Sequence, residues 1–176
     1  MRIALCQVNT TVGAFKENVE KICSFVEQAA EKRADVAVFP ELVLSSYPPL
    51  DLLDRLDFVE ANENALEDLQ KRLQKLKSLP ELIILGTLRR VLDQVAGRAL
   101  ENTVVVLKSG KLVHTQAKKL LPTYDVFDET RYFRPNQNDA AIYDSSLGKI
   151  GLSVCEDGWF SDPHSGVLAG RHLYAT

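Results

Sequence analysis

Cysteine and histidine are scarce in this chain. The 176 residues include three cysteines, Cys6, Cys23 and Cys155, and three histidines. Three scattered cysteines provide neither a disulfide framework nor the paired ligand spacing of a zinc site. The histidines show no HExxH or HxH spacing either. We therefore expect reduced thiols and no metal site.

An excess of positive charge and long apolar runs are also missing. Lysine and arginine number 21 against 24 aspartates and glutamates, a formal net charge of −3, so no basic field is available for phosphates. No apolar run reaches the length of a membrane span, and residues 1–2 lead into a strand-like segment rather than a signal-peptide core. We expect no nucleic-acid partner, no membrane association and a cytoplasmic location.

The composition that is present, 45% apolar and 26% charged, suits one globular α/β domain over residues 1–176. Residues 2–9 and 34–41 have the apolar, β-forming character of strands. Between them, apolar side chains recur at helical spacing from Val19 to Ala30. A strand-helix-strand order predicts a parallel pair joined by a crossover.

The rest of the chain is richer in hairpins. The patterns predict a helix at 66–76, a strand at 82–91, a hairpin over 102–118 turning at Ser109-Gly110, and a second hairpin of 140–144 with 149–156. After Trp159 we expect a loop and a helix. Helices in the first half and hairpins in the second favour a sandwich with outer helices over a doubly wound sheet.

Cys155 is the first residue that could carry chemistry. It closes the predicted strand 149–156, where functional loops of α/β sheets lie, although a lone strand cysteine is also an ordinary core residue. The adjacent acids Glu156 and Asp157 make a core position costly and would raise the pKa of the thiol. A reactive Cys155 would therefore need a cation or a base from elsewhere.

Two other predicted strands end in charged residues. Glu41 closes "AVFPE", where a partly desolvated carboxylate could act as a general base. Lys118 and Lys119 close a strand in "AKKLLP", where a cation could stabilise a thiolate or an oxyanion. Taken alone, each residue is more readily explained as a solvated charge at a strand end.

Taken in order, "VFPEL", "KKLLP" and "VCEDGW" resemble the three signature motifs of the nitrilase, or carbon-nitrogen hydrolase, superfamily. Residues 41–53 and 120–135 are similar to the glutamine-hydrolysing domain of glutamine-dependent NAD synthetases. The resemblance implies an α/β fold, the nitrilase-like α-β-β-α sandwich. Because that domain continues through further strands, we expect its C-terminal part to be missing here. The sequence also lacks the SGGxDS-type motif of a synthetase domain.

The resemblance also implies catalytic roles. Glu41 matches the general base and Cys155 the nucleophile of the family. The family lysine stands three residues before the Leu-Pro of its motif, which selects Lys118 over Lys119. Glu129 matches a second glutamate that supports the lysine.

A substrate pocket is implied by further matches. Tyr124 and Phe127 match aromatic positions that line the glutamine pocket, and we expect Glu156 to bind substrate with them. Asp125 stands where the family usually has glycine, a replacement that a left-handed backbone tolerates best for Asp or Asn.

The implied reaction is hydrolysis of the glutamine side-chain amide through a cysteine thioester. It needs no cofactor; ATP and Mg²⁺ would serve only the absent synthetase domain, which uses the ammonia to amidate deamido-NAD. Two alternatives stay open: a stand-alone amidase or carbamoylase, and an inactive truncated fragment with an interaction role. Because missing strands leave unpaired edges, we expect a homo-oligomer or association with a synthetase domain.

Overall fold

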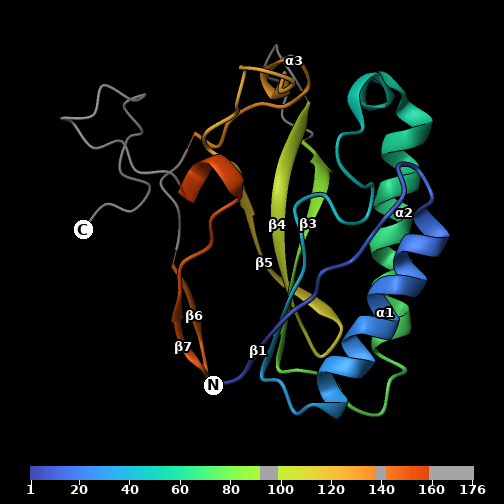
Figure 1. Ribbon diagram of the computed structural model, residues 1–176, viewed down its shortest axis with the longest axis vertical. Coiled ribbons are helices and arrows are strands. Elements are labelled where there is room, and N and C mark those ends of the chain that lie inside the picture. The colour runs from blue at the N-terminus through green and yellow to red at the C-terminus, as the bar shows by residue number, and fades with distance from the viewer. Residues whose placement is uncertain (92–98, 138–141, 159–176) are drawn as a thin grey trace.

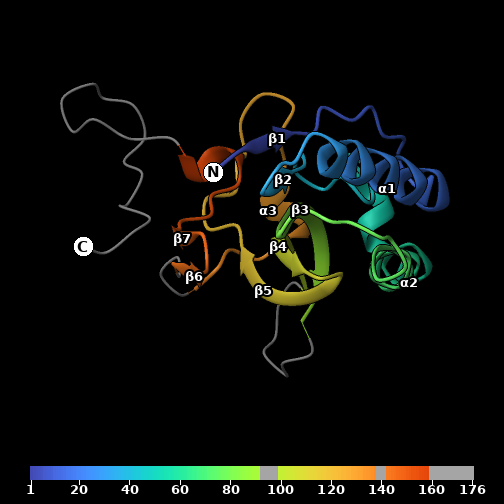
Figure 2. The same cartoon turned by 90° about the horizontal axis from the view of Figure 1, so that it is seen from below.

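The computed structural model describes residues 1–91, 99–137 and 142–158, and it builds them in layers (Figures 1 and 2). Two long helices, α1 (Phe15–Glu31) and α2 (Leu56–Leu73), cover one face of a five-stranded sheet. A small hairpin lies on the other face. This layering agrees with the first three layers of the expected α-β-β-α sandwich. The predicted segment after Trp159 and the start of the strand at 140–141 lie outside the described residues.

The five-stranded sheet follows the chain order. Its strands are β1 (Ile3–Leu5), β2 (Val36–Val38), β3 (Leu82–Arg90), β4 (Leu100–Lys108) and β5 (Lys111–Ala117). β1, β2 and β3 are mutually parallel, whereas β3, β4 and β5 pair antiparallel. The predicted parallel pair with its helical crossover and the hairpin turning at 109–110 are therefore confirmed.

Helix α1 forms because its apolar side chains share one face. Val19, Ile22 and Val26 are buried at spacings of three and four residues, the stripe that a sheet-covering helix needs. Helix α2 also buries one stripe, but it begins at Leu56, ten residues before the predicted start. The sequence pattern missed its first turns because buried Phe58, Val59 and Asn62 do not extend the leucine repeat.

Strand alternation divides the core into two parts. Ile83 and Leu85 of β3 face the helices, whereas Leu82 and Ile84 belong to a separate apolar cluster beneath the hairpin. Both clusters are buried, so the sheet is covered over its centre. At its β1 edge, however, Ile3 and Leu5 keep 48% and 73% of their surface exposed.

The hairpin consists of β6 (Tyr143–Ser145) and β7 (Gly148–Ile150), so the predicted second turn is confirmed. The prediction that strand 149–156 runs on to Cys155 is wrong. Ladder pairing in the described chain stops at Ile150, and Leu152 and Val154 pack into the apolar cluster without forming a strand. The described residues also include the short helices η1 (Leu50–Asp54), α3 (Glu129–Tyr132) and η2 (Cys155–Gly158).

No helix within the described ranges combines the length and the apolar character that crossing a bilayer requires.

Candidate active site

Glu41 enters the site from the loop that follows β2. The loop packs directly against β3 at Gly86, where an added Cβ would lie 2.4 Å from the backbone nitrogen of Leu42 and 2.6 Å from the Glu41 Cα. Only glycine allows the two backbones to come this close. The Gly86 N–H also donates a hydrogen bond to the carbonyl of Pro40 at 3.2 Å. The backbone of Glu41 is thus held on the sheet.

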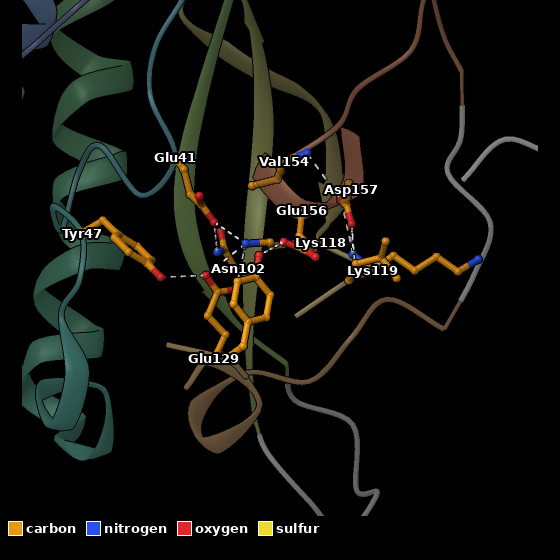
Figure 3. A network of polar contacts seen from close by, with 11 residues as sticks. Glu41, Tyr47, Asn102, Lys118, Lys119, Glu129, Val154, Glu156 and Asp157 are labelled. Atoms are coloured by element: carbon orange, nitrogen blue, oxygen red, sulfur yellow. Dashed lines mark hydrogen bonds and ion pairs between the residues drawn. The ribbon is translucent and has the colours of Figure 1, made fainter. Parts of the chain in front are cut away.

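Lys118, the residue after β5, meets Glu41 at the same end of the sheet (Figure 3). Its Nζ donates to Glu41 Oε1 at 2.8 Å. The same oxygen accepts a hydrogen bond of 2.6 Å from Nδ2 of Asn102, a β4 residue. The Lys118 side chain is fully buried, whereas 19% of the Glu41 side chain stays exposed. Glu41 is therefore a carboxylate with one oxygen held by two hydrogen bonds and with part of its side chain exposed.

Glu129, the first residue of α3, supports the lysine from the opposite side. Nζ of Lys118 lies 3.0 Å from Oε1 and 2.9 Å from Oε2 of Glu129. Tyr47, from the loop after Glu41, donates its hydroxyl hydrogen to Glu129 Oε1 at 3.0 Å. Lys118 is thus paired with two carboxylates, as a buried cation must be.

Charge and burial oppose each other in this cluster. Burial by itself would lower the pKa of Lys118, but Glu41 and Glu129 together hold that pKa above its ordinary value. For Glu129, burial raises the pKa and the lysine partly offsets the rise. Lys118 is consequently a fixed cation at neutral pH.

Cys155 begins η2 instead of ending a strand. Its φ of +46° lies in the left-handed region, which a non-glycine residue enters only when the surrounding structure holds it there. The residue is exposed and lines a cavity of about 330 Å³ together with Glu41, Gly86 and Val104. The cavity thus connects Cys155 with the carboxylate that the loop after β2 supplies.

The thiol of Cys155 is not preionised. Burial of the sulfur raises its pKa, and the negative charge of Glu41 raises it further, while Lys118 acts in the opposite direction. At neutral pH the sulfur therefore keeps its proton, and a nearby base must accept that proton before the sulfur can attack. Glu41 lines the same cavity as Cys155.

Asp157 joins the cysteine turn to the lysine segment. Its carboxylate accepts backbone N–H groups from Lys119 at 3.0 Å and Leu120 at 2.8 Å, and a longer one from Val154 at 3.4 Å. The backbone N–H of Asp157 returns a bond of 3.0 Å to the Val154 carbonyl. These bonds anchor the turn that carries Cys155 next to the end of β5.

The predicted pocket residues gather around the cysteine turn. The Tyr124 hydroxyl donates to Glu156 Oε2 at 2.8 Å, and its ring meets Phe127 edge to face with centroids 5.7 Å apart. Phe127 in turn lies 6.3 Å from Tyr47. Asp125 has a φ of +55°, which confirms that the position taken by glycine in the family is left-handed here.

The structure brings the predicted residues Glu41, Lys118 and Glu129 into contact and places Cys155 on the cavity that Glu41 lines, whereas the sequence does not identify several of their partners. No motif marks Asn102, and Tyr47 lies in the family-like segment 41–53 without a role that the resemblance assigns. Gly86 did leave a signal, because a glycine inside an apolar strand marks a close backbone approach. In the described part of the chain, no group of three His, Cys, Asp or Glu residues is arranged to hold a metal ion.

Comparison with known proteins agrees with this geometry. Residues 2–163 match the family described as carbon-nitrogen hydrolase, and the chain belongs to that family. Among curated relatives, the glutamine-dependent NAD(+) synthetase of Xylella fastidiosa is 37% identical over 172 residues, which are 97% of this chain and 30% of that protein. The corresponding protein of a Synechocystis species is 40% identical over 158 residues, covering 89% of this chain and 28% of its own length.

Solved structures show the same fold. The glutamine-dependent NAD+ synthetase of Acinetobacter baumannii superposes with a TM-score of 0.75 at 29% identity, covering 88% of this chain and 27% of that one. An amidase from a Nesterenkonia species gives a TM-score of 0.71 at 20% identity, covering 89% and 56%. The chain thus has the carbon-nitrogen hydrolase fold and spans about 30% of the length of the NAD synthetases that it matches.

Proposed function

We propose that this chain hydrolyses the side-chain amide of glutamine through a thioester on Cys155. The observation that carries the proposal is the convergence of Glu41, Lys118 and Cys155, since one cavity and one ion pair join them. The similarity to glutamine-dependent NAD synthetases over 97% of the chain supports glutamine as the substrate.

The first half of the reaction forms the thioester. Glu41 takes the proton from the Cys155 thiol while the sulfur adds to the carboxamide carbon. The tetrahedral oxyanion that develops lies beside the Lys118 ammonium, a fixed charge that needs no rearrangement. Protonated Glu41 then gives its proton to the leaving nitrogen, and the carbon-nitrogen bond breaks to release ammonia.

The second half returns the enzyme to its starting state. Glu41 removes a proton from a water molecule as the water oxygen adds to the thioester carbon. Collapse of the second tetrahedral intermediate breaks the carbon-sulfur bond, releases glutamate and lets the sulfur regain its proton from Glu41. We expect this half-reaction to need no cofactor, and the ammonia to serve an ATP-dependent and Mg²⁺-dependent amidation of deamido-NAD by a synthetase domain.

The test is glutamate release from L-glutamine by the purified chain, beside Cys155→Ala and with Cys23→Ala as the matched thiol control. Cys23 is a half-buried residue of α1, and burial raises its pKa to about 11, so its loss should leave turnover unchanged. We expect turnover that is lost in Cys155→Ala only. Asparagine and simple amides run in parallel: turnover of those substrates without glutamine turnover would replace this proposal with a stand-alone amidase.

A further inference from the structure

Asn102 is buried where the site residues meet, with only 1% of its surface exposed. Its Nδ2 donates to Glu41 Oε1 at 2.6 Å, and its backbone carbonyl accepts the N–H of Lys118 at 2.7 Å. One residue of β4 therefore contacts both the carboxylate and the chain segment that carries the lysine (Figure 3).

The two donors reach the same oxygen of Glu41. Asn102 and Lys118 both bond to Oε1, and within the described chain no hydrogen bond reaches Oε2. A carboxylate held by two donors on one oxygen cannot turn about its last torsion without breaking both bonds. Oε2 is thereby left for proton transfer at the cavity that Cys155 lines.

Packing alone does not explain an amide at this position. Oδ1 of Asn102 is buried and has no hydrogen-bond partner among the described residues, a condition that costs stability. The reverse amide orientation would set Oδ1 against the Glu41 carboxylate and is repulsive. An apolar side chain of similar size would avoid the unpaired oxygen, so the side chain at 102 has a use other than packing.

We propose that Asn102 is a positioning residue that orients Glu41 for proton transfer from Cys155. The proposal rests on the proposed function in so far as Glu41 is the base that acts on this thiol. Asn102 touches neither the sulfur nor the cavity wall given above, so its effect passes through Glu41.

The test replaces Asn102 by leucine, which keeps the number and branching of side-chain heavy atoms and removes both the donor and the unpaired oxygen. Thr103→Val is the matched control, because Thr103 is equally buried on the same strand and faces the helices. Three quantities are measured in each purified chain: the melting temperature, kcat and KM for glutamine, and the rate at which iodoacetamide alkylates Cys155. Peptide mass spectrometry separates Cys155 from Cys6 and Cys23.

We expect Asn102→Leu to melt no lower than the parent chain. Its kcat should fall roughly 10- to 100-fold with little change in KM, since misorienting a base removes transition-state stabilisation. Alkylation of Cys155 should slow in parallel. Thr103→Val should leave kcat and alkylation unchanged.

Two results would overturn the proposal: parental kcat and alkylation rates in Asn102→Leu, or losses that only follow a lowered melting temperature. If leucine prevents folding, Asn102→Ala removes the donor without adding volume and should show the same slowed alkylation. Slowed alkylation in a chain whose parent does not hydrolyse glutamine would support the role of Asn102 and reject the proposed function. Glutamine turnover that Asn102→Leu leaves intact would do the reverse.

Discussion

The helix-facing and hairpin-facing sides of the main sheet are built by the same strands yet differ in chemistry. On the helix side, Ile83, Leu85 and Val105 are almost completely buried in one apolar cluster. On the hairpin side, the sheet carries Gly86 and Asn102, a cavity, and a buried lysine between two glutamates. Neighbouring residues such as Leu85 and Gly86 therefore serve different purposes.

This difference indicates that the two sides of the sheet contribute differently to stability and to reactivity. The helix side buries a large apolar cluster, which supplies hydrophobic free energy to folding. The hairpin side keeps buried charges and a cavity, which cost stability but supply the electrostatics of a site. Substitutions on the two sides should therefore affect stability and turnover separately.

Lys118→Met should have the largest effect. Removing the cation leaves the Glu41 and Glu129 carboxylates without their partner, which we expect to cost about 3–5 kcal/mol of unfolding free energy. Glutamine turnover should fall at least ~100-fold, as for loss of an oxyanion donor. Urea unfolding and glutamate release measure the two effects, with Lys119→Met as the control. Parental stability in Lys118→Met would mean that the ion pairs are not formed.

Leu85→Ala probes the helix side. The side chain is fully buried, so its truncation should cost about 2–5 kcal/mol of unfolding free energy. Because Leu85 faces away from the cavity, kcat of the folded fraction should equal that of the parent chain. Chemical denaturation together with kcat measured well below the melting temperature tests this separation. A kcat loss in fully folded protein would contradict it.

Gly86→Ala is the matched probe of the hairpin side, one residue further along β3. The new methyl group would collide with the backbone of Glu41 and Leu42, and we expect a cost of about 1–3 kcal/mol. Unlike Leu85→Ala, it should lower kcat in folded molecules because the Glu41 loop must move. Gly158→Ala is the control, since the nearest atom to its added Cβ is 3.9 Å away. Equal kcat values for both alanine variants would show that the close approach at Gly86 does not set the position of Glu41.

The smallest expected effect is a change in the pH dependence of stability at Asp157. Burial raises the pKa of Asp157 above its ordinary value of 3.8, although three backbone N–H groups partly offset the rise. The folded state therefore binds this proton more tightly, so the free energy of unfolding falls as the pH rises from 3.8 through the folded pKa. Asp157→Asn should remove that part of the decline, which denaturant titrations from acidic to neutral pH would detect. An unchanged slope would exclude a raised pKa.

Much of the fold follows from local patterns. The apolar stripe of α1 and the alternating or fully apolar segments of β3 and β4 predict their elements because each pattern matches one backbone period. The prediction failed at residues 151–155, where apolar residues look like a strand but find no pairing partner in the described chain. A strand depends on its neighbour, which periodicity does not contain.

The site residues also fall into those that the sequence identifies and those that only the structure identifies. Glu41, Lys118, Glu129 and Cys155 could be named from their motifs, and Glu41, Lys118 and Cys155 were suspected from the ends of predicted strands. Their functional roles stay predictions. The sequence does not identify Asn102, and it includes Tyr47 only as part of the segment 41–53, because the importance of both lies in contacts with residues 61 and 82 positions away along the chain.

The order of residues alone thus predicts helix α1, the tight hairpins and the motif residues, since these depend mainly on neighbours close along the chain. Only the tertiary structure decides which oxygen of Glu41 is held, that Lys118 is fully buried, and that Cys155 adopts a left-handed turn. The physical reason is that burial, hydrogen-bond geometry and pKa arise between segments distant in the chain, and they exist only once the sheet has brought those segments together.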